Sequence, residues 1–222
     1  MALRSGMIVE PILLDLPDET GRLDLSTIFN DQAAEGASVP GGSRPVELEI
    51  GSGKGTFLLA ISEVKPGTNY IGFEWAKEYA NYAADRLRRH HRMNCRIVGG
   101  EATWWIRCHV PDNSIQAVHI YFPDPWPKTR HHKRRIIQLP FLKDLHRILV
   151  PGGKLRLVTD HADYFAHMQE MLAAQTDLRV VAFESPVAAQ MSEAGMIVGT
   201  NFEKKYIAEG RSFHATAAMK PG

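Results

Sequence analysis

The stretch that decides the fold is "VELEIGSGKGTFLLAISEV", residues 46–64. Its first five residues are typical of a short β-strand and are followed by a glycine-rich turn. Residues 54–64 then carry apolar side chains at the spacing of an α-helix. A strand that passes through a glycine turn into a helix is the opening unit of many ligand-binding α/β folds. We therefore expect an α/β domain to begin near residue 46.

The alternation of strand and helix continues beyond this unit. Further strands are predicted at 70–74, 95–100, 114–122 and 154–160, with helices at 76–91, 102–110, 136–149 and 162–174 and two late strands near 178–184 and 211–219. Such alternation predicts a mostly parallel central sheet with helices on both faces. Residues 1–45, with their Gly- and Pro-rich segment 31–45, are predicted to form a partly flexible N-terminal arm, and 46–222 to form the domain.

The bulk composition excludes several classes of protein. The chain has 222 residues, 44% of them hydrophobic, and a formal net charge of +1. Two cysteines, Cys95 and Cys108, and ten histidines occur without the spacing of a metal motif. No apolar run is long enough to cross a bilayer, and acidic residues near the start argue against a secretory signal. We expect a cytoplasmic protein with no metal and no membrane span, and both monomer and homodimer stay open.

Acidic side chains recur at the ends of the predicted strands. Glu49, Glu74, Asp124 and Asp160 each fall at or just beyond such an end. The carboxyl ends of parallel strands meet at one edge of a sheet, where α/β folds bind their ligands. This recurrence is the strongest indication of where a functional site would lie.

The glycine turn indicates the kind of ligand. Residues 49–55, "EIGSGKG", have glycine at every second position, whereas a dinucleotide fingerprint would need a glycine at Thr56, and a P-loop motif is absent. Glu49 would attract an ammonium group and repel phosphate, and Glu74 is placed to bind both hydroxyls of a ribose. A ligand with a ribose, an ammonium group and no phosphate is S-adenosylmethionine. The alternative is a tight turn whose glycines serve only packing.

A second unusual stretch is "YFPDPWPKTRHHKRRI", residues 121–136. Asp124 and Trp126 could hold a planar heterocycle, the ring by stacking and the carboxylate by balancing a developing positive charge. The three prolines around them restrict the backbone, so less entropy is lost on binding. The cations that follow match the phosphates of a nucleic acid. The alternative is a solvated helix N-terminus, which clustered positive charge would destabilise.

Together these motifs resemble the bacterial tRNA (guanine-N7-)-methyltransferase family. The motifs are "EIGSGKG" (49–55), "GFE" (72–74), "PDNS" (111–114), "FPDPWPKTRHHKRR" (122–135), "TD" (159–160) and "TNFEKK" (200–205). The resemblance runs from about residue 46 to the C-terminus. It implies a class I, Rossmann-like methyltransferase fold with an antiparallel late strand. It also implies a tRNA-modifying enzyme that moves a methyl group from S-adenosylmethionine to N7 of a guanine in the tRNA variable loop.

The resemblance also implies roles for individual residues. Glu49, Gly51, Gly53, Glu74, Glu101 and Asp124 would bind the cofactor, with Asp124 also catalytic; Lys128, Asp160, Thr200, Asn201, Phe202 and Glu203 would bind the substrate; Arg130, His131, His132, Lys133, Arg134 and Arg135 would contact the RNA. At Glu101 the family usually has Asp or Asn. Glu203 is expected to read guanine by accepting hydrogen bonds from its N1–H and N2–H₂ groups.

Two other functions stay open at this point. One is a methyltransferase that acts on a small heterocycle or a protein amide, which leaves the basic tract unexplained. The other is a non-catalytic RNA-binding protein on a methyltransferase fold, which leaves the strand-end acids unexplained.

Overall fold

A computed structural model describes residues 7–14, 21–25, 27–29, 44–187, 198 and 200–222, without the side chains of 201, 202 and 204. The chain divides into two compact units, Met1–Pro111 and Asp112–Gly222. No helix in the described part has the length and apolar content that a membrane span requires. Nor do the described residues include a group of three or more His, Cys, Asp or Glu side chains that could hold a metal ion.

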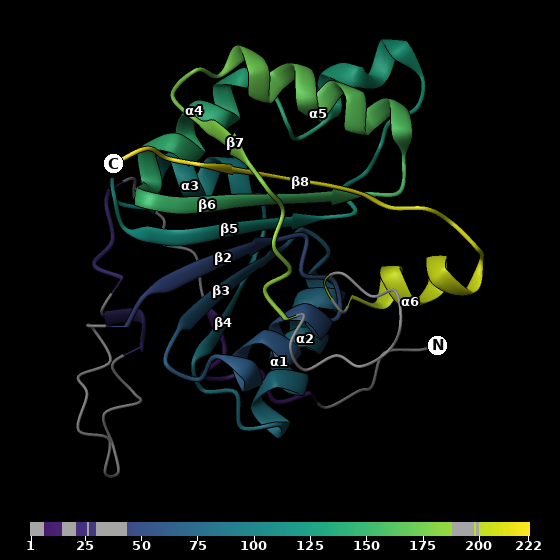
Figure 1. The fold of residues 1–222 in the computed structure, drawn as a ribbon. Coiled ribbons are helices and arrows are strands. Elements are labelled where there is room, and N and C mark those ends of the chain that lie inside the picture. The colour runs from purple at the N-terminus through teal and green to yellow at the C-terminus, as the bar shows by residue number, and fades with distance from the viewer. Residues whose placement is uncertain (1–6, 15–20, 26, 30–43, 188–197, 199) are drawn as a thin grey trace. The chain divides into compact units, whose positions relative to one another are not determined.

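The first unit contains a parallel sheet and three helices (Figure 1). Its elements are β1 (Leu13–Leu14), β2 (Val46–Ile50), α1 (Thr56–Val64), β3 (Asn69–Glu74), α2 (Lys77–Arg89), β4 (Cys95–Gly99) and α3 (Ala102–His109). The strands lie in the order β1-β4-β3-β2, and each neighbouring pair is parallel. All five residues of β2 are buried, as expected of a parallel strand that is covered on both faces.

Close packing around the glycine turn explains why this segment needs small residues. A Cβ at Gly72 of β3 would lie 2.4 Å from Ser52 Oγ and 2.6 Å from Leu58 Cδ1 of α1, so a larger residue there would require these side chains to move. Gly55 has φ of 68°, and a Cβ there would lie 3.1 Å from the Cβ of Ala83 in α2. Glycine tolerates this left-handed conformation, and its lack of a side chain allows α2 to pack against the turn.

Part of the predicted N-terminal arm belongs to the core of the first unit. Ile12, Leu25 and Phe29 are buried, and β1 extends the sheet by pairing with β4. The guanidinium group of Arg96 lies 4.9 Å from the ring centroid of Phe29 and donates a hydrogen bond to the carbonyl oxygen of Ile28. These described residues therefore pack as core, whereas segment 31–43 lies outside the described part.

The second unit contains parallel and antiparallel strand pairs (Figure 1). Its elements are β5 (Ile115–Tyr121), the 3₁₀ helix η3 (Thr129–Arg134), α4 (Leu139–Ile148), β6 (Leu149–Thr159), α5 (Ala162–Ala174), β7 (Arg179–Val181), α6 (Asn201–Ala208) and β8 (His214–Met219). The strand order is β5-β6-β8-β7. The β5–β6 pair is parallel, and β8 is antiparallel to both β6 and β7.

The observed elements confirm the predicted fold class, a mostly parallel α/β sheet with a late antiparallel strand. The boundaries differ most at the predicted helix 136–149. It begins only at Leu139, with Pro140 in its first turn, where the missing N–H of proline is tolerated. The strand predicted at 154–160 begins earlier, at Leu149, and residues 151–153 lie inside β6 at the register shift between Ile115 and Ala117 of β5. Helix α6 and the short η3 were not predicted as helices.

Candidate functional site

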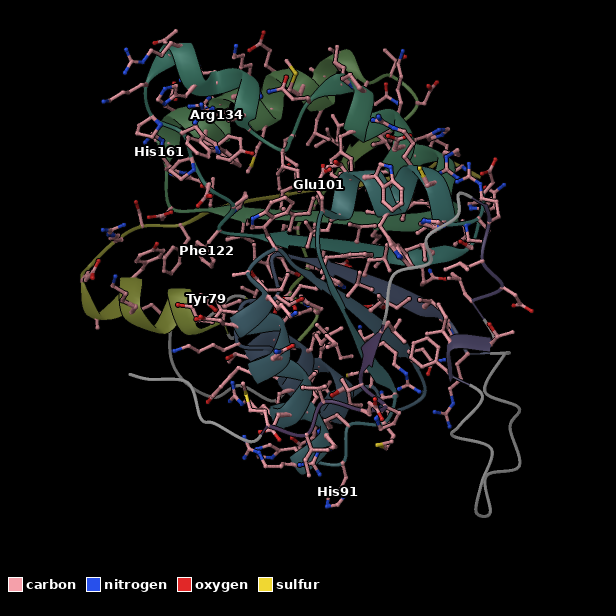
Figure 2. The ribbon with its side chains drawn as sticks, turned by 180° about the vertical axis from the view of Figure 1, so that it is seen from behind. Tyr79, His91, Glu101, Phe122, Arg134 and His161 are labelled. Carbon is pink, nitrogen blue, oxygen red and sulfur yellow. The ribbon has the colours of Figure 1, made fainter. Side chains whose placement is uncertain are left out.

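Three glutamates of the first unit lie at or just after the carboxyl ends of adjacent parallel strands. Glu49 pairs in register with Gly72, and Glu74 pairs with Gly99, the last residue of β4. Glu101 comes just after β4, where α3 begins (Figure 2). These pairings bring the three predicted cofactor-binding acids to one edge of the sheet.

Glu49 is the most perturbed acid of this edge. Its side chain is almost fully buried, and this loss of hydration raises the pKa of its carboxyl group from 4.5 to about 8. The nearby Ser52 hydroxyl opposes the shift, and the charge of Glu74 adds to it. Among the described residues, Oε2 of Glu49 has no hydrogen-bond partner. A buried carboxylate oxygen without a donor is costly, so a cationic or hydrogen-bonding ligand here would be favoured.

Glu74 ties the glycine turn to the end of β3. Its Oε2 accepts a hydrogen bond from the backbone N–H of Gly53 at 2.7 Å, and its Oε1 accepts one from the N–H of Ala76 at 2.9 Å. Each carboxylate oxygen keeps a second lone pair that can accept from a ligand hydroxyl. The sequence predicted the ligand contact at this position but not these two backbone contacts.

The glycine backbone beside these acids faces open space. Gly51 and Gly53 have φ values of 84° and 52°, and a Cβ on either would meet no atom of the described residues within 4 Å. The exposed carboxylate of Glu101 accepts a hydrogen bond from the Thr103 hydroxyl. Open backbone beside acidic side chains suits a ligand with ammonium and hydroxyl groups better than a phosphate.

In the second unit, two aspartates follow adjacent parallel strands. Asp124 lies just beyond β5 and is exposed, and no described residue forms a hydrogen bond or ion pair with its carboxylate. Asp160 follows β6 and accepts a hydrogen bond from Arg211 Nη1 at 2.7 Å. Burial and the charge of Asp160 raise the pKa of the Tyr206 hydroxyl, and Asp124 contributes to the same shift. Both aspartates therefore lie close enough to Tyr206 to influence its titration.

The segment that carries Asp124 has an unusual backbone. Phe122 and Trp126 have φ values of 52° and 43°, in the left-handed region that large side chains rarely adopt. The ring of Phe122 packs edge-to-face against Tyr206 and against Phe213, with centroid distances of 5.5 Å in both pairs. Such conformations persist only when surrounding contacts hold them, and they occur most often at functional sites.

The basic tract lies in and beside η3. Its exposed members are Lys128, Arg130, Lys133 and Arg134, and its half-buried members are His131 and His132. The guanidinium group of Arg134 lies 4.9 Å from a ring centroid of Trp126, and His131 packs edge-to-face against the same indole at 5.9 Å. One face of Trp126, predicted to stack on a heterocycle, is therefore covered by Arg134.

Arg135 departs from the rest of this tract. Only 2% of it is exposed, and its guanidinium group hydrogen-bonds to Pro125 and Asp163. The sequence predicted an RNA contact because Arg135 follows four other cations closely. Because burial withdraws the charge from the surface, we do not retain Arg135 among the RNA contacts.

Glu203 also differs from its prediction. Its side chain is fully buried and accepts hydrogen bonds from the Val198 N–H at 3.2 and 3.0 Å, and its own N–H donates to the Thr200 hydroxyl at 3.0 Å. Thr200 is the N-cap of α6, so "TNFE" resembles a capping box, a signal that the sequence already contained. This arrangement gives the Glu203 carboxylate a role in capping the helix, so its contact with a base stays a prediction. Asn201 and Phe202 belong to α6, but their side chains lie outside the described part.

Arg211 is a site residue that the sequence did not indicate. It lies 51 residues after Asp160, yet it donates to that carboxylate, and its guanidinium group lies 4.5 Å from the ring centroid of Tyr206. No local motif marks it, because only the tertiary fold brings the loop after α6 to the end of β6.

Known proteins resemble this chain over most of its length. A family model described as "Putative methyltransferase" matches residues 43–216. A tRNA (guanine-N(7)-)-methyltransferase of Alkalilimnicola ehrlichii is 34% identical over 197 residues, which cover 89% of this chain and 77% of that protein. A protein of the same name from Halorhodospira halophila is 34% identical and covers 90% of this chain and 80% of its own length.

Other matches cover less of the relative. A tRNA (guanine-N(7)-)-methyltransferase of Rhodopirellula baltica is 39% identical over 155 residues, and this chain spans only 55% of its length. Among solved structures, the antibiotic-resistance methyltransferase Kmr matches with a TM-score of 0.55 at 17% identity, covering 89% of this chain and 93% of its own. A SAM dependent methyltransferase from Aquifex aeolicus has a TM-score of 0.54 at 16% identity, covering 79% of this chain and 82% of its own. These two structures establish the likeness of the fold.

Proposed function

The chain belongs to the tRNA (guanine-N(7)-)-methyltransferase family, and on this basis we propose that it methylates N7 of a guanine in the variable loop of tRNA, with S-adenosylmethionine as methyl donor. The observation that carries the proposal is the exposed carboxylate of Asp124, which lies in the loop between β5 and the basic residues of η3. A tRNA substrate agrees with the cytoplasmic location expected from the sequence.

The first unit offers the groups that the cofactor needs. S-adenosylmethionine supplies a reactive methyl group on a positively charged sulfur. Glu49, whose Oε2 has no partner in the described chain, would bind the ammonium group, and the free lone pairs of Glu74 would accept from the ribose hydroxyls. The open backbone at Gly51 and Gly53 gives such a ligand room to approach, and Glu101 would contact the adenine amino group.

The second unit offers the groups that the guanine needs. N7 of guanine has a lone pair and no proton, so no general base is required. The purine becomes more positive during the transfer, and the carboxylate of Asp124 would stabilise that charge in the transition state. Lys128, Asp160 and the α6 segment that begins at Thr200 would hold the nucleotide, so that most of the rate enhancement comes from alignment.

The exposed cations of η3 would bind the RNA backbone. Arg130, Lys133 and Arg134 are exposed on one short element, and charges of this kind position a nucleic acid without reading its sequence. Extracting a guanine from its stack costs a few kcal/mol, which these phosphate contacts would offset.

The test is a methylation assay with the purified chain, radiolabelled S-adenosylmethionine and an unmodified tRNA transcript. The tRNA is digested to nucleosides, and the label is expected only in 7-methylguanosine. A matched transcript with adenine at the target position should stay unlabelled. Label in another nucleoside, or in no RNA at all while a small heterocycle or a protein is labelled, would contradict the proposal.

A further inference from the structure

Arg135 is the most deeply buried cation of the basic tract. It directly follows Lys133 and Arg134, which are exposed, but only 2% of Arg135 is accessible. A long charged side chain is rarely buried unless its hydrogen-bonding groups are satisfied inside the protein. The position of Arg135 therefore requires an explanation other than contact with a phosphate.

The guanidinium group of Arg135 joins two separate segments of the second unit. Its Nε donates to the carbonyl oxygen of Pro125 at 2.9 Å, and its Nη2 donates to Oδ2 of Asp163 in the first turn of α5. The group also lies 4.9 Å from the ring centroid of Tyr164. Arginine suits this task because its planar fork directs several donors along fixed directions.

The residues after Arg135 are fixed to the same helix. The N–H of Ile137 donates to the hydroxyl of Tyr164 at 3.3 Å, and the Ile137 carbonyl oxygen lies 2.8 Å from Nε2 of His167. The segment from Arg135 to Ile137 is therefore held to α5 by several side chains of that helix. The hydrogen bond from Arg135 to the Pro125 carbonyl oxygen connects this segment to the preceding loop.

Pro125 lies between the two residues whose placement matters most for the proposed chemistry. Asp124 precedes it and Trp126 follows it, and Phe122 and Trp126 both have positive φ values. An arrangement of this kind relaxes unless tertiary contacts hold it. The hydrogen bond from Arg135 restrains the peptide group that joins Pro125 to Trp126.

We infer that Arg135 is a positioning residue, which holds the Asp124–Trp126 loop against α5 through Pro125 and does not contact RNA. The inference rests on the proposed function for its catalytic consequence, because displacement of Asp124 by about 1 Å would be expected to slow transfer by up to about 100-fold. Its structural content, the fixed conformation of the loop, is independent of the substrate.

The decisive variant is Arg135→Lys. Lysine keeps the positive charge and serves well as a phosphate contact, but it has one nitrogen and cannot reproduce the two donors of the fork. We expect kcat to fall by about 10- to 100-fold, with the KM for tRNA and the salt dependence of tRNA binding unchanged. A kcat near that of the wild type would overturn the inference.

Two controls separate positioning from RNA binding. Lys133→Ala removes an exposed cation of η3 and should make the slope of log K against log salt shallower by about 0.7 to 0.9. Arg179→Lys changes an exposed arginine in β7 and should alter neither kcat nor the slope. If Arg135→Ala also reduces the slope by the amount seen for Lys133→Ala, Arg135 is an RNA contact and the inference is wrong.

Asp163→Ala tests the other end of the contact and avoids truncating a buried side chain. Asp163 is exposed, so its removal leaves no cavity, yet it takes away the acceptor that orients Arg135. We expect kcat to fall by at least about 3-fold while tRNA affinity is unchanged or rises, since one negative charge is lost near the RNA. A wild-type kcat would overturn the inference whatever the tRNA affinity, because Oδ2 of Asp163 also lies 3.7 Å from Nε2 of His132 and its loss can change RNA binding by that route.

A measurement without substrate keeps the inference separate from the proposed function. In protein labelled with 5-fluorotryptophan, the ¹⁹F resonance of Trp126 can be assigned by its loss in Trp126→Phe. Arg135→Lys and Asp163→Ala should both shift or broaden this resonance, and Arg179→Lys should not. An unchanged resonance in both variants would overturn the inference, even if the wild type fails to methylate tRNA, which would by itself contradict only the proposed function.

Discussion

Asp124 lies at the point where a single charge matters most for the proposed reaction. The exposed carboxylate of Asp124 follows β5. The charges of Asp124 and Asp160 both raise the pKa of the Tyr206 hydroxyl. A charge of this kind contributes little to folding and little to holding the ground-state substrate. Its contribution is expected in the transition state, where the purine carries positive charge.

Asp124→Asn should therefore lower the single-turnover rate by about 100-fold or more, while the dissociation constant of tRNA stays within about 3-fold of the wild type. Asparagine keeps the size of the side chain and removes only its charge. Rapid-quench methylation and equilibrium tRNA binding measure the two quantities separately. A normal single-turnover rate would show that Asp124 only positions the base.

Glu49 gives a second prediction, about pH. An unfolded glutamate loses its proton near pH 4.5, whereas burial holds the pKa of folded Glu49 at about 8. Between these values the folded state binds one proton more than the unfolded state. This contribution to the unfolding free energy therefore falls as pH rises, by about 1.4 kcal/mol per pH unit.

Urea unfolding at pH 6, 7 and 8 measures this effect. Wild type should lose stability across the series relative to Glu49→Gln, which cannot ionise. Glu170→Gln, at an exposed position of α5, is the matched control and should follow the wild type. Parallel pH profiles for wild type and Glu49→Gln would show that Glu49 is ionised in the folded protein across this range.

The residue-scale predictions from sequence succeeded where backbone geometry decides the outcome. Glu49 and Glu74 come to one edge because parallel strands align their ends, which the strand pattern alone indicates, whereas Glu101 was expected there only from the family resemblance. Arg135 and Glu203 could not be assigned in this way, because both look like surface charges in the sequence. The burial of Arg135 depends on α5, which lies far from it in the sequence. The burial of Glu203 depends on α6, which was not predicted.

Among the elements, α6 depends on its first turn. The Thr200 hydroxyl accepts from the Glu203 N–H, and the Glu203 carboxylate accepts from the Val198 N–H, so two residues satisfy groups at the start of the helix. The helix has eight residues, too few to be stable without such capping and tertiary packing.

Thr200→Ala should destabilise the protein by about 1 kcal/mol through loss of the cap. Glu203→Gln should cost about 1–3 kcal/mol, because a buried charged acceptor is replaced by an amide that fits the same donor less well. Thermal unfolding measures both. The ratio of guanine to inosine methylation should stay at the wild-type value in Glu203→Gln, and a change in that ratio would restore Glu203 as a base-reading residue.

The elements that were predicted and those that were missed differ in physical origin. Helix α5 was predicted at its observed bounds, and its buried residues Tyr164, Met168 and Leu172 recur at every fourth position. Strand β1 has two residues, and η3 is a 3₁₀ helix made only of threonine, arginine, histidine and lysine, so neither has an apolar pattern that could reveal it. Such elements form because of tertiary contacts with the surrounding chain, not because of a local sequence pattern.

At the scale of the molecule, the first unit depends on residues near the N-terminus. Phe29 is fully buried and lies under the Arg96 guanidinium group, itself 1% exposed. Phe29→Ala should destabilise the protein by about 3–5 kcal/mol, because it leaves a cavity and uncovers a buried cation. Urea unfolding measures the loss, and Ile8→Ala, at an exposed side chain, is the control with no expected effect. Equal stabilities would mean that this segment is dispensable for folding.

The position of β8 has a consequence for how the protein is made. It pairs with β6 on one side and β7 on the other, although it is the last of the three to be synthesised. While the ribosome is still translating the segment before residue 214, neither neighbour has its partner, and the β6 edge is left with unpaired backbone groups. Exposed strand edges recruit other chains. Messenger RNAs that are truncated before the β8 codons, or on which ribosomes stall before them, should therefore yield products that aggregate. Slow codons placed just before those of β8 should lower the soluble yield.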